Sequence, residues 1–231
     1  MNNDWLISLR SPYTPSLISP NLPSQFFDAS QQGDPPVKLG VLASGSGSNF
    51  VSIAQAIAAR QLNAQIQVLI YNRPQAKVAE RAPLWNVPTV FLDHKQYKVR
   101  EKYDAQLVET LKQYQVEWVV MAGWMRIVTP VLLEAFSDRV LNIHPSLLPS
   151  FPGVHAIEQA LQAGVTITGC TVHMAAVEVD SGPILLQAAV PIVPGDTPET
   201  LHRRVQVQEH KIYPPAIALA VAREAAQTST Y

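Results

Sequence analysis

The sequence predicts an α/β fold, with a mainly parallel twisted sheet flanked by helices and an antiparallel strand pair near the C-terminus. Three observations predict it. Short apolar runs alternate with helical patterns between residues 38 and 143, which is typical of βαβ units in a parallel sheet. A glycine- and serine-rich turn, residues 45–49, joins the first apolar run to the first helical pattern. Two longer strand-like segments, residues 166–176 and 184–191, follow the alternation.

Each element has a local signal. The apolar runs predict strands at residues 38–43, 67–71, 89–92, 118–122 and 140–143. Spacings of three and four between apolar residues predict helices at residues 50–59, 75–85, 97–114 and 154–162. The sequence Thr197-Pro198-Glu199 is typical of a helix start, because proline is well tolerated in the first turn. That helix is expected to reach about residue 212, and Pro214 and Pro215 are expected to kink or interrupt it.

The chain divides into a tail and one folded domain. Residues 1–36 contain six prolines among serine, asparagine and glutamine, and no helical or strand periodicity runs through them. We therefore expect a disordered or loosely docked tail over residues 1–36 and a single domain over residues 37–231. An organelle transit peptide is the alternative, since acidic residues are few, but the tail holds only one arginine, Arg10.

Composition argues against several classes of function. Hydrophobic residues make up 47% of the 231 residues and charged residues 15%, as in an ordinary globular protein. The net charge of −1 gives no electrostatic basis for binding nucleic acid or an anionic membrane, so neither is expected as a partner. No apolar run is long enough to span a bilayer, and MNNDWLISLR does not resemble a signal peptide. With Cys170 as the single cysteine, we expect a reducing compartment, the cytoplasm.

The stretch LNIHPSLLPSFPG, residues 141–153, carries the strongest chemical signal. Asn142 and His144 are two residues apart, so on a strand both side chains lie on one face. Pro145 ends the strand and restricts the backbone of His144 to an extended conformation. A carboxylate, Asp180, follows in VEVDSGP. An amide and an imidazole can stabilise a developing oxyanion, and an imidazole with a carboxylate can move protons, so the set suits acyl transfer to an amine.

The turn Gly45-Ser46-Gly47-Ser48-Asn49 is a candidate anion site. Glycines allow the backbone to approach a ligand, and the following helix offers free N–H groups at its start. A dinucleotide fingerprint is not favoured, because Phe50 stands where its third glycine would be, and a Walker loop is excluded because no Gly-Lys-Ser/Thr follows. From the turn alone, a plain tight connection between strand and helix is equally consistent with the sequence.

Other reactive side chains are weaker candidates. His155 and His173 form no metal-ligand spacing with Cys170 or with each other, so no metal is expected. We interpret His173 as a histidine that supports the site or the structure, and Cys170 as a buried strand thiol. Gln206 and Glu209 share a helix face, which by itself indicates a solvated surface.

With its Asn-x-His-Pro-Ser-Leu-Leu-Pro and HMAAVEVDSGP motifs, the chain resembles the folate-dependent formyltransferases from about residue 38 to about residue 222. The resemblance implies a Rossmann-like formyltransferase fold. It also implies transfer of a formyl group from 10-formyltetrahydrofolate, a co-substrate, to the amine of glycinamide ribonucleotide in purine synthesis. Asn142, His144 and Asp180 are then catalytic.

The resemblance also assigns binding residues. Gly45, Ser46, Gly47, Ser48 and Asn49 match the loop for the ribonucleotide phosphate, although the family often has asparagine at the position of Ser46. The residues implied for the ribose hydroxyls are Gln206 and Glu209. Those implied for the folate are Arg100, Met125, Arg126, Ile127, Val128, Val177 and Val179, with valine at 177 where relatives often carry an acid.

Alternatives remain on the same core. A formyltransferase acting on methionyl-tRNA or on an amino sugar would share these motifs, but the tRNA enzymes carry a further C-terminal domain. A formyltetrahydrofolate deformylase would use a similar triad on water, but those enzymes carry an N-terminal regulatory domain and usually histidine at the position of Pro145. A non-catalytic folate-binding protein would not need all three of Asn142, His144 and Asp180.

Overall fold

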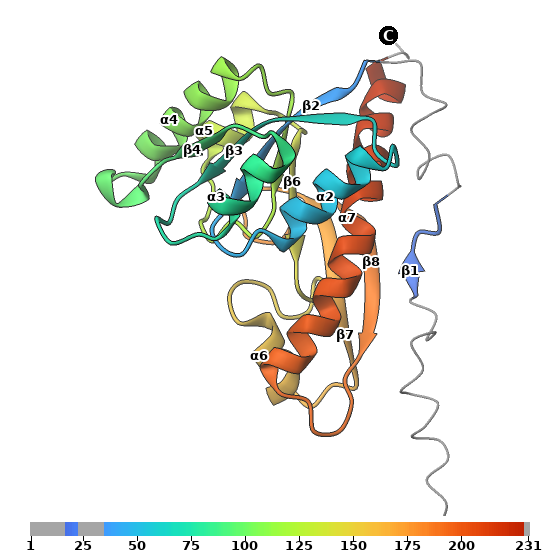
Figure 1. Ribbon diagram of the computed structural model, residues 1–231. Coiled ribbons are helices and arrows are strands. Elements are labelled where there is room, and N and C mark those ends of the chain that lie inside the picture. The colour runs from blue at the N-terminus through green and yellow to red at the C-terminus, as the bar shows by residue number, and fades with distance from the viewer. Residues whose placement is uncertain (1–16, 23–34, 229–231) are drawn as a thin grey trace, which may run out of the picture.

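The computed structural model describes residues 17–22 and 35–228 (Figure 1). Over these residues the chain forms one sheet of eight strands in the order β1-β8-β7-β6-β5-β2-β3-β4. The strands are β1 (Ile18–Ser19), β2 (Val37–Ala43), β3 (Ala64–Tyr71), β4 (Thr89–Phe91), β5 (Trp118–Met121), β6 (Val140–His144), β7 (Ile167–Met174) and β8 (Ile184–Pro191).

The sheet has a parallel and an antiparallel part. β4, β3, β2, β5 and β6 pair in parallel, each with its neighbour. β7 runs antiparallel to β6, and β8 runs antiparallel to β7. The predicted fold class is therefore confirmed, including the antiparallel pair near the C-terminus. The change of direction at β6 places the end of β6 beside the middle of β7, where His144 lies opposite Thr171.

Helices connect the parallel strands and cover both faces of the sheet. They are α2 (Ser48–Ala58), α3 (Val78–Arg81), α4 (Arg100–Gln113), α5 (Pro130–Ala135), α6 (Ala156–Gln162) and α7 (Pro198–Thr228), with 3-10 turns η3 (Ala82–Trp85) and η4 (His94–Gln96). α2 packs against α7 on one face, and α4 packs against α5 on the other (Figure 1). None of the helices within the described ranges is both long enough and apolar enough to cross a membrane.

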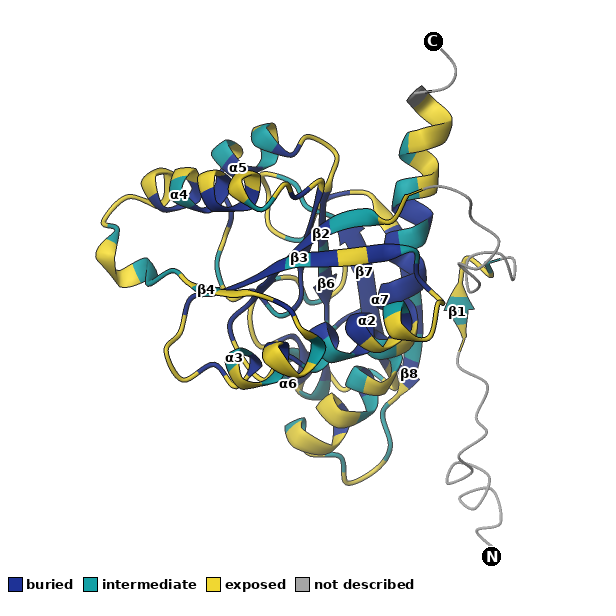
Figure 2. Ribbon diagram, turned by 45° about the horizontal axis from the view of Figure 1, so that its top comes forward, coloured by how far each residue is buried: buried dark blue, intermediate teal, exposed yellow. Residues whose placement is uncertain are grey.

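Alternation along the central strands builds two hydrophobic cores. In β2, Leu39 and Val41 point into the core under α2 and α7, whereas Leu42 points into the core under α4. All three side chains have no exposed surface. Figure 2 shows the central strands of the sheet coloured mostly as buried. α4 approaches β2 so closely that a Cβ on Gly40 would lie 2.5 Å from a methyl carbon of Leu111. A glycine at that position is therefore required by packing.

Three sequence-based expectations differ from the structure. α7 continues through Pro214 and Pro215 without a break, because the adjacent Tyr213 and Ala216 are fully buried and their packing outweighs the lost backbone hydrogen bonds. The helix expected at residues 75–85 is shorter and ends in the 3-10 turn η3, which has proline near its start. α5 was not predicted.

Most of the tail predicted at residues 1–36 lies outside the described residues. Within the described part, Ile18 and Ser19 pair with Ala188 and Gln187 of β8. The backbone N–H of Ala189 also donates to the carbonyl of Leu17 at 3.0 Å. This short segment therefore covers part of the outer edge of β8.

Candidate functional site

The end of β6 brings together the amide, the imidazole and the carboxylate. Asn142 and His144 lie on the same face of β6, as the spacing predicts, and His144 is only 5% exposed. Asp180 lies in the turn between β7 and β8, where its backbone has a φ of 56°, a left-handed conformation that is uncommon outside glycine. The turn directs the Asp180 carboxylate back to the end of β6, since it contacts both Asn142 and His144.

The Asp180 carboxylate lies at the centre of the cluster and contacts each of the other groups. Its Oδ2 accepts a hydrogen bond from the backbone N–H of Gly153 at 2.8 Å and lies 3.2 Å from Nδ1 of His144. Its Oδ1 accepts from Nδ2 of Asn142 at 3.3 Å and lies 3.6 Å from Nε2 of His173. Both oxygens therefore have partners on two sides, which fixes the orientation of the carboxylate.

The surroundings of Asp180 lower its pKa. Burial is the largest single influence and acts to raise the pKa. The hydrogen bonds from His173 and from the N–H of Gly153, with the charges of His144 and His173, together outweigh burial. The carboxylate is thus held in its charged form, ready to pair with an imidazolium.

Both ring nitrogens of His144 face hydrogen-bond acceptors. Nδ1 faces the Asp180 carboxylate at 3.2 Å, and Nε2 lies 2.8 Å from the backbone carbonyl of Phe151. Only a doubly protonated ring can donate to both. An imidazolium is also the form that can stabilise an oxyanion.

His173 belongs to this cluster, in line with the supporting role that the sequence suggested. Its Nδ1 lies 2.8 Å from the carbonyl of Met174, and its Nε2 lies 3.1 Å from Nδ2 of Asn142. A neutral ring protonated on Nδ1 satisfies both contacts, whereas a charged ring would direct Nε2–H to Asp180 instead. His173 lies opposite Asn142 in the β6–β7 register, and that register cannot be read from the sequence.

The glycine- and serine-rich turn forms the start of α2 at the end of β2. Gly47 precedes the helix with a φ of 76°, and a Cβ there would lie 2.3 Å from the side chain of Val78. Gly45 and Ser46 are exposed, Ser48 at the start of α2 is half-buried, and Gly47 and Asn49 are buried. The turn thus combines an exposed backbone at Gly45 and Ser46 with the positive dipole charge of the helix start that follows, two features that an anion site requires.

Glu209 of α7 reaches this turn and is buried, against the expectation of a solvated surface. Its side chain is 5% exposed, and its carboxylate accepts a hydrogen bond from Nδ2 of Asn49 at 2.9 Å. Burial raises the pKa of Glu209, and the hydrogen bond from Asn49 opposes that rise. Oδ1 of Asn49 is buried and has no hydrogen-bond partner within the described residues. Gln206, one turn earlier, is half-buried.

Cys170 takes no part in this chemistry. It is fully buried on β7, as expected, and burial raises the pKa of its thiol. Over the described ranges no three His, Cys, Asp or Glu side chains are grouped so that they could hold a metal ion.

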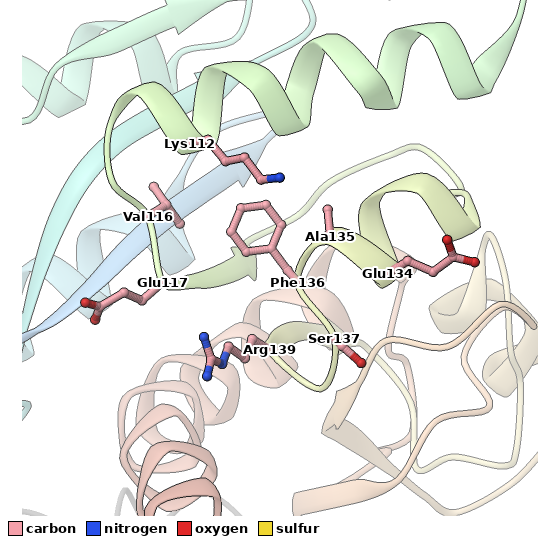
Figure 3. A pocket seen from close by; sticks show the side chains of 8 residues that line it. All are labelled: Lys112, Val116, Glu117, Glu134, Ala135, Phe136, Ser137 and Arg139. Carbon is pink, nitrogen blue, oxygen red and sulfur yellow. The ribbon is translucent and has the colours of Figure 1, made fainter.

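A separate pocket of about 390 Å³ lies at the opposite end of the sheet (Figure 3). Glu117 and Arg139 directly precede β5 and β6, so this pocket is at the amino ends of those strands. Its lining residues are Lys112, Val116, Glu117, Glu134, Ala135, Phe136, Ser137 and Arg139. Open parallel sheets bind ligands at the carboxyl ends of their strands, where the clustered residues lie, so the pocket is not the candidate active site.

Comparison with known proteins decides the family. The family model described as formyl transferase matches residues 37–217. The chain belongs to the formyl transferase family. Phosphoribosylglycinamide formyltransferase of Bacillus subtilis is 41% identical to it over 180 residues, which cover 78% of this chain and 92% of that one. The human trifunctional purine biosynthetic protein adenosine-3 is 42% identical over 185 residues, which cover 80% of this chain but 18% of the human protein.

Solved structures agree with this membership. Glycinamide ribonucleotide transformylase 1 of Symbiobacterium toebii is 46% identical with a TM-score of 0.80, covering 81% of this formyl transferase and 89% of that chain. Phosphoribosylglycinamide formyltransferase of Bacillus halodurans is 44% identical with a TM-score of 0.78, and the match covers 81% of this chain and 96% of that one. The segment before residue 37, including β1, lies outside the range that the family model matches.

The folate residues implied for a formyl transferase lie on two loops and a helix start. Met125 and Ile127 are 64% and 48% exposed, whereas Val128 is buried. Val177 and Val179 are 64% and 47% exposed, on the loop that ends at Asp180. These exposed apolar side chains are available to cover a flat ring, and Val177 and Val179 directly precede Asp180 in sequence.

The two arginines of the implied folate set behave differently. The guanidinium of Arg126 lies 4.7 Å from the centre of the Tyr103 ring, a cation–π contact, so its charge is directed into the protein. Arg100 opens α4 and is exposed. Of the two, Arg100 is the arginine whose charge remains available to a ligand.

Proposed function

We propose that this formyl transferase moves the formyl group of 10-formyltetrahydrofolate to the amine of glycinamide ribonucleotide. The observation that carries the proposal is the arrangement of two sites on one sheet edge. The catalytic cluster lies at the end of β6 and the phosphate turn follows β2, with β5 between them. Two strand spacings are roughly 10 Å, so one small molecule with an amine and a phosphate at opposite ends can reach both.

The amine attacks the formyl carbon, and the resulting oxyanion needs hydrogen-bond donors. Nδ2 of Asn142 donates to Oδ1 of Asp180 at 3.3 Å and lies 3.1 Å from Nε2 of His173, and Nε2 of His144 lies 2.8 Å from the carbonyl oxygen of Phe151. The formyl oxygen must therefore replace at least one of these partners when the substrates bind. Because the donors are already aligned by the cluster, such an exchange requires little rearrangement.

Collapse of the tetrahedral intermediate breaks the bond from carbon to the folate nitrogen. The attacking amine loses a proton, and the departing folate nitrogen gains one, so the step is balanced. Asp180 is charged and contacts His144, which suits it either to hold the imidazolium in place or to pass the proton through a water molecule.

We propose that the two substrates bind to different groups of residues around the cluster. The start of α2 takes the phosphate, and Glu209 with Gln206 takes the ribose hydroxyls, because both lie on the α7 stripe that reaches Asn49. The exposed apolar residues at 125, 127, 177 and 179 take the folate ring, and Arg100 takes its acidic tail.

One assay tests this assignment. Loss of the formyl group from 10-formyltetrahydrofolate is followed with glycinamide ribonucleotide, with glycinamide riboside, with charged methionyl-tRNA and with no acceptor. We expect rapid loss with the ribonucleotide and at least about 100-fold slower turnover with the riboside, because the phosphate positions the amine. Equal loss without any acceptor would identify a deformylase, and preference for the tRNA would identify the other transferase.

A further inference from the structure

The loop after β6 supplies two of the contacts that organise the catalytic cluster. We call residues 145–153 the active-site loop. The carbonyl of Phe151 lies 2.8 Å from Nε2 of His144, and the N–H of Gly153 donates to Asp180 at 2.8 Å. Both are backbone groups, so the position of the loop itself sets the geometry of these side chains.

A buried hydroxyl on β7 holds the beginning of this loop. Oγ1 of Thr171 donates to the carbonyl of Ser146 at 2.7 Å and accepts from the N–H of Leu148 at 3.0 Å. It also accepts from Nε2 of Gln187 at 3.0 Å, which uses the hydroxyl's one hydrogen and both of its lone pairs. Thr171 has no exposed surface, so water cannot replace these partners without a rearrangement.

Gln187 on β8 completes the attachment. Its Nε2 donates to the carbonyl of Leu148 at 2.9 Å as well as to Thr171, so both of its amide hydrogens are used. Thr171 and Gln187 are direct partners across the β7–β8 ladder. Beside them, the side chain of Leu147 lies so close to Gly169 that a Cβ there would come within 2.8 Å of it. The loop is thus docked on the antiparallel part of the sheet.

We propose that Thr171 and Gln187 are positioning residues for formyl transfer, which hold the active-site loop where its backbone meets His144 and Asp180. Neither acts on the substrate directly. The kinetic part of this inference rests on the proposed function, because it takes formyl transfer to glycinamide ribonucleotide as its readout. A displacement of about 1 Å at catalytic groups can lower a rate by about 100-fold, so loosening three anchored backbone groups is enough to affect turnover.

The test compares Thr171→Val with Thr171→Ser in the full chain. Valine keeps the shape and removes the hydroxyl, whereas serine keeps the hydroxyl. Thr168→Val is a matched control, because Thr168 lies on the same strand, is 1% exposed, and has a buried hydroxyl for which the described residues provide no partner. We expect Thr171→Val to lower kcat by about 10- to 100-fold with KM for both substrates within about threefold. Thr171→Ser and Thr168→Val should keep nearly the full kcat.

Hydrogen exchange gives a readout that does not depend on the reaction. In the wild type the amides of Leu148 and Gly153 should be protected, and in Thr171→Val both should exchange at least about tenfold faster. If the wild type lacks formyl transfer, the proposed function fails, and the exchange data still decide whether the loop is anchored. If Thr171→Val does not fold, Gln187→Leu provides the same two measurements.

Three results would overturn the inference. They are a wild-type kcat in Thr171→Val, an equal loss in Thr171→Ser, and an increase in exchange that spreads over the whole domain rather than over the loop.

Discussion

Replacing Asp180 by asparagine removes one negative charge while nearly preserving the shape of the side chain. The amide has a single acceptor oxygen, so it can serve one side of the cluster only. If that oxygen keeps the N–H of Gly153, the amide nitrogen takes the place of Oδ1 and faces Nδ2 of Asn142, two donors against each other. His144 also loses the charge that favours its imidazolium. We therefore expect the substitution to disturb both oxyanion donors at once.

The expected fall in kcat follows from the loss of these contacts and of the charge. A positioned acid or base contributes about 10²- to 10⁴-fold to a rate, so we expect kcat of Asp180→Asn to fall by about 10²- to 10³-fold. At 1.36 kcal/mol for each factor of ten, this raises the activation free energy by about 3–4 kcal/mol. KM for both substrates should stay within about threefold, because a carboxylate that orients an imidazole matters more in the transition state than in the bound state.

The same variant tests the ionisation of Asp180. Its folded pKa is lowered, so the charged carboxylate contributes stability that is fully present above the ordinary value of 3.8 and is lost as the pH falls through the folded pKa. Asp180→Asn has no such group. In urea unfolding, the excess stability of the wild type over the variant should therefore be constant above about pH 5 and shrink below it.

Steady-state kinetics and urea unfolding together decide the outcome. Turnover near the wild-type value in a folded Asp180→Asn protein would refute the catalytic role of Asp180 and leave it a structural one. A stability difference that does not change with pH would show that the pKa of Asp180 is not lowered in the folded state.

Three further predictions concern the phosphate turn, α7 and the tail. Gly47→Ala should lower the free energy of unfolding by at least about 1–2 kcal/mol, because Gly47 has a positive φ and a Cβ there would contact Val78. Gly45→Ala should lower it far less, because the space around a Cβ at Gly45 is open. Equal losses of stability in the two variants would contradict this prediction. Glu209→Gln should raise KM for glycinamide ribonucleotide by about 10- to 100-fold, because a hydrogen bond to a charged group is worth about 1.5–3 kcal/mol. KM for the folate should stay unchanged. An unchanged KM for the ribonucleotide would show that Glu209 does not belong to the site. Deleting residues 1–22 should lower the free energy of unfolding by about 0.5–1.5 kcal/mol, because the pairing of β1 with β8 is lost, and should leave kcat unchanged. Deleting residues 1–16, which keeps β1, should change neither quantity. Equal stability of the two deletion variants would show that β1 contributes nothing to stability.

Local patterns were sufficient to predict most of the fold. The predicted first strand at residues 38–43 differs from β2, Val37–Ala43, by one residue, and the alternation of apolar runs and helices gave the parallel part of the sheet. The prolines of α7 were misjudged because proline propensity is local, whereas the burial of Tyr213 and Ala216 that sustains the helix is tertiary.

The candidate site was predictable where its signal lies within one strand. Asn142 and His144 are two residues apart on β6, so their common face follows from strand geometry alone. His173 approaches Asn142 only because β7 pairs with β6 in one particular register, and Glu209 is buried only because α7 packs against α2. These contacts join residues far apart in the chain, and no periodicity encodes them.

The pairing of β1 with β8 has a consequence for how copies of this protein meet one another. An uncovered outer strand offers its free N–H and C=O groups to any other chain, which is a common route to aggregation. On one border of the sheet β1 occupies part of β8, and on the other border β4 is only three residues long. A chain without β1 would expose a longer stretch of β8, Ile184–Pro191, to intermolecular strand pairing. In the described structure β1 therefore leaves fewer free backbone groups on β8 for such pairing.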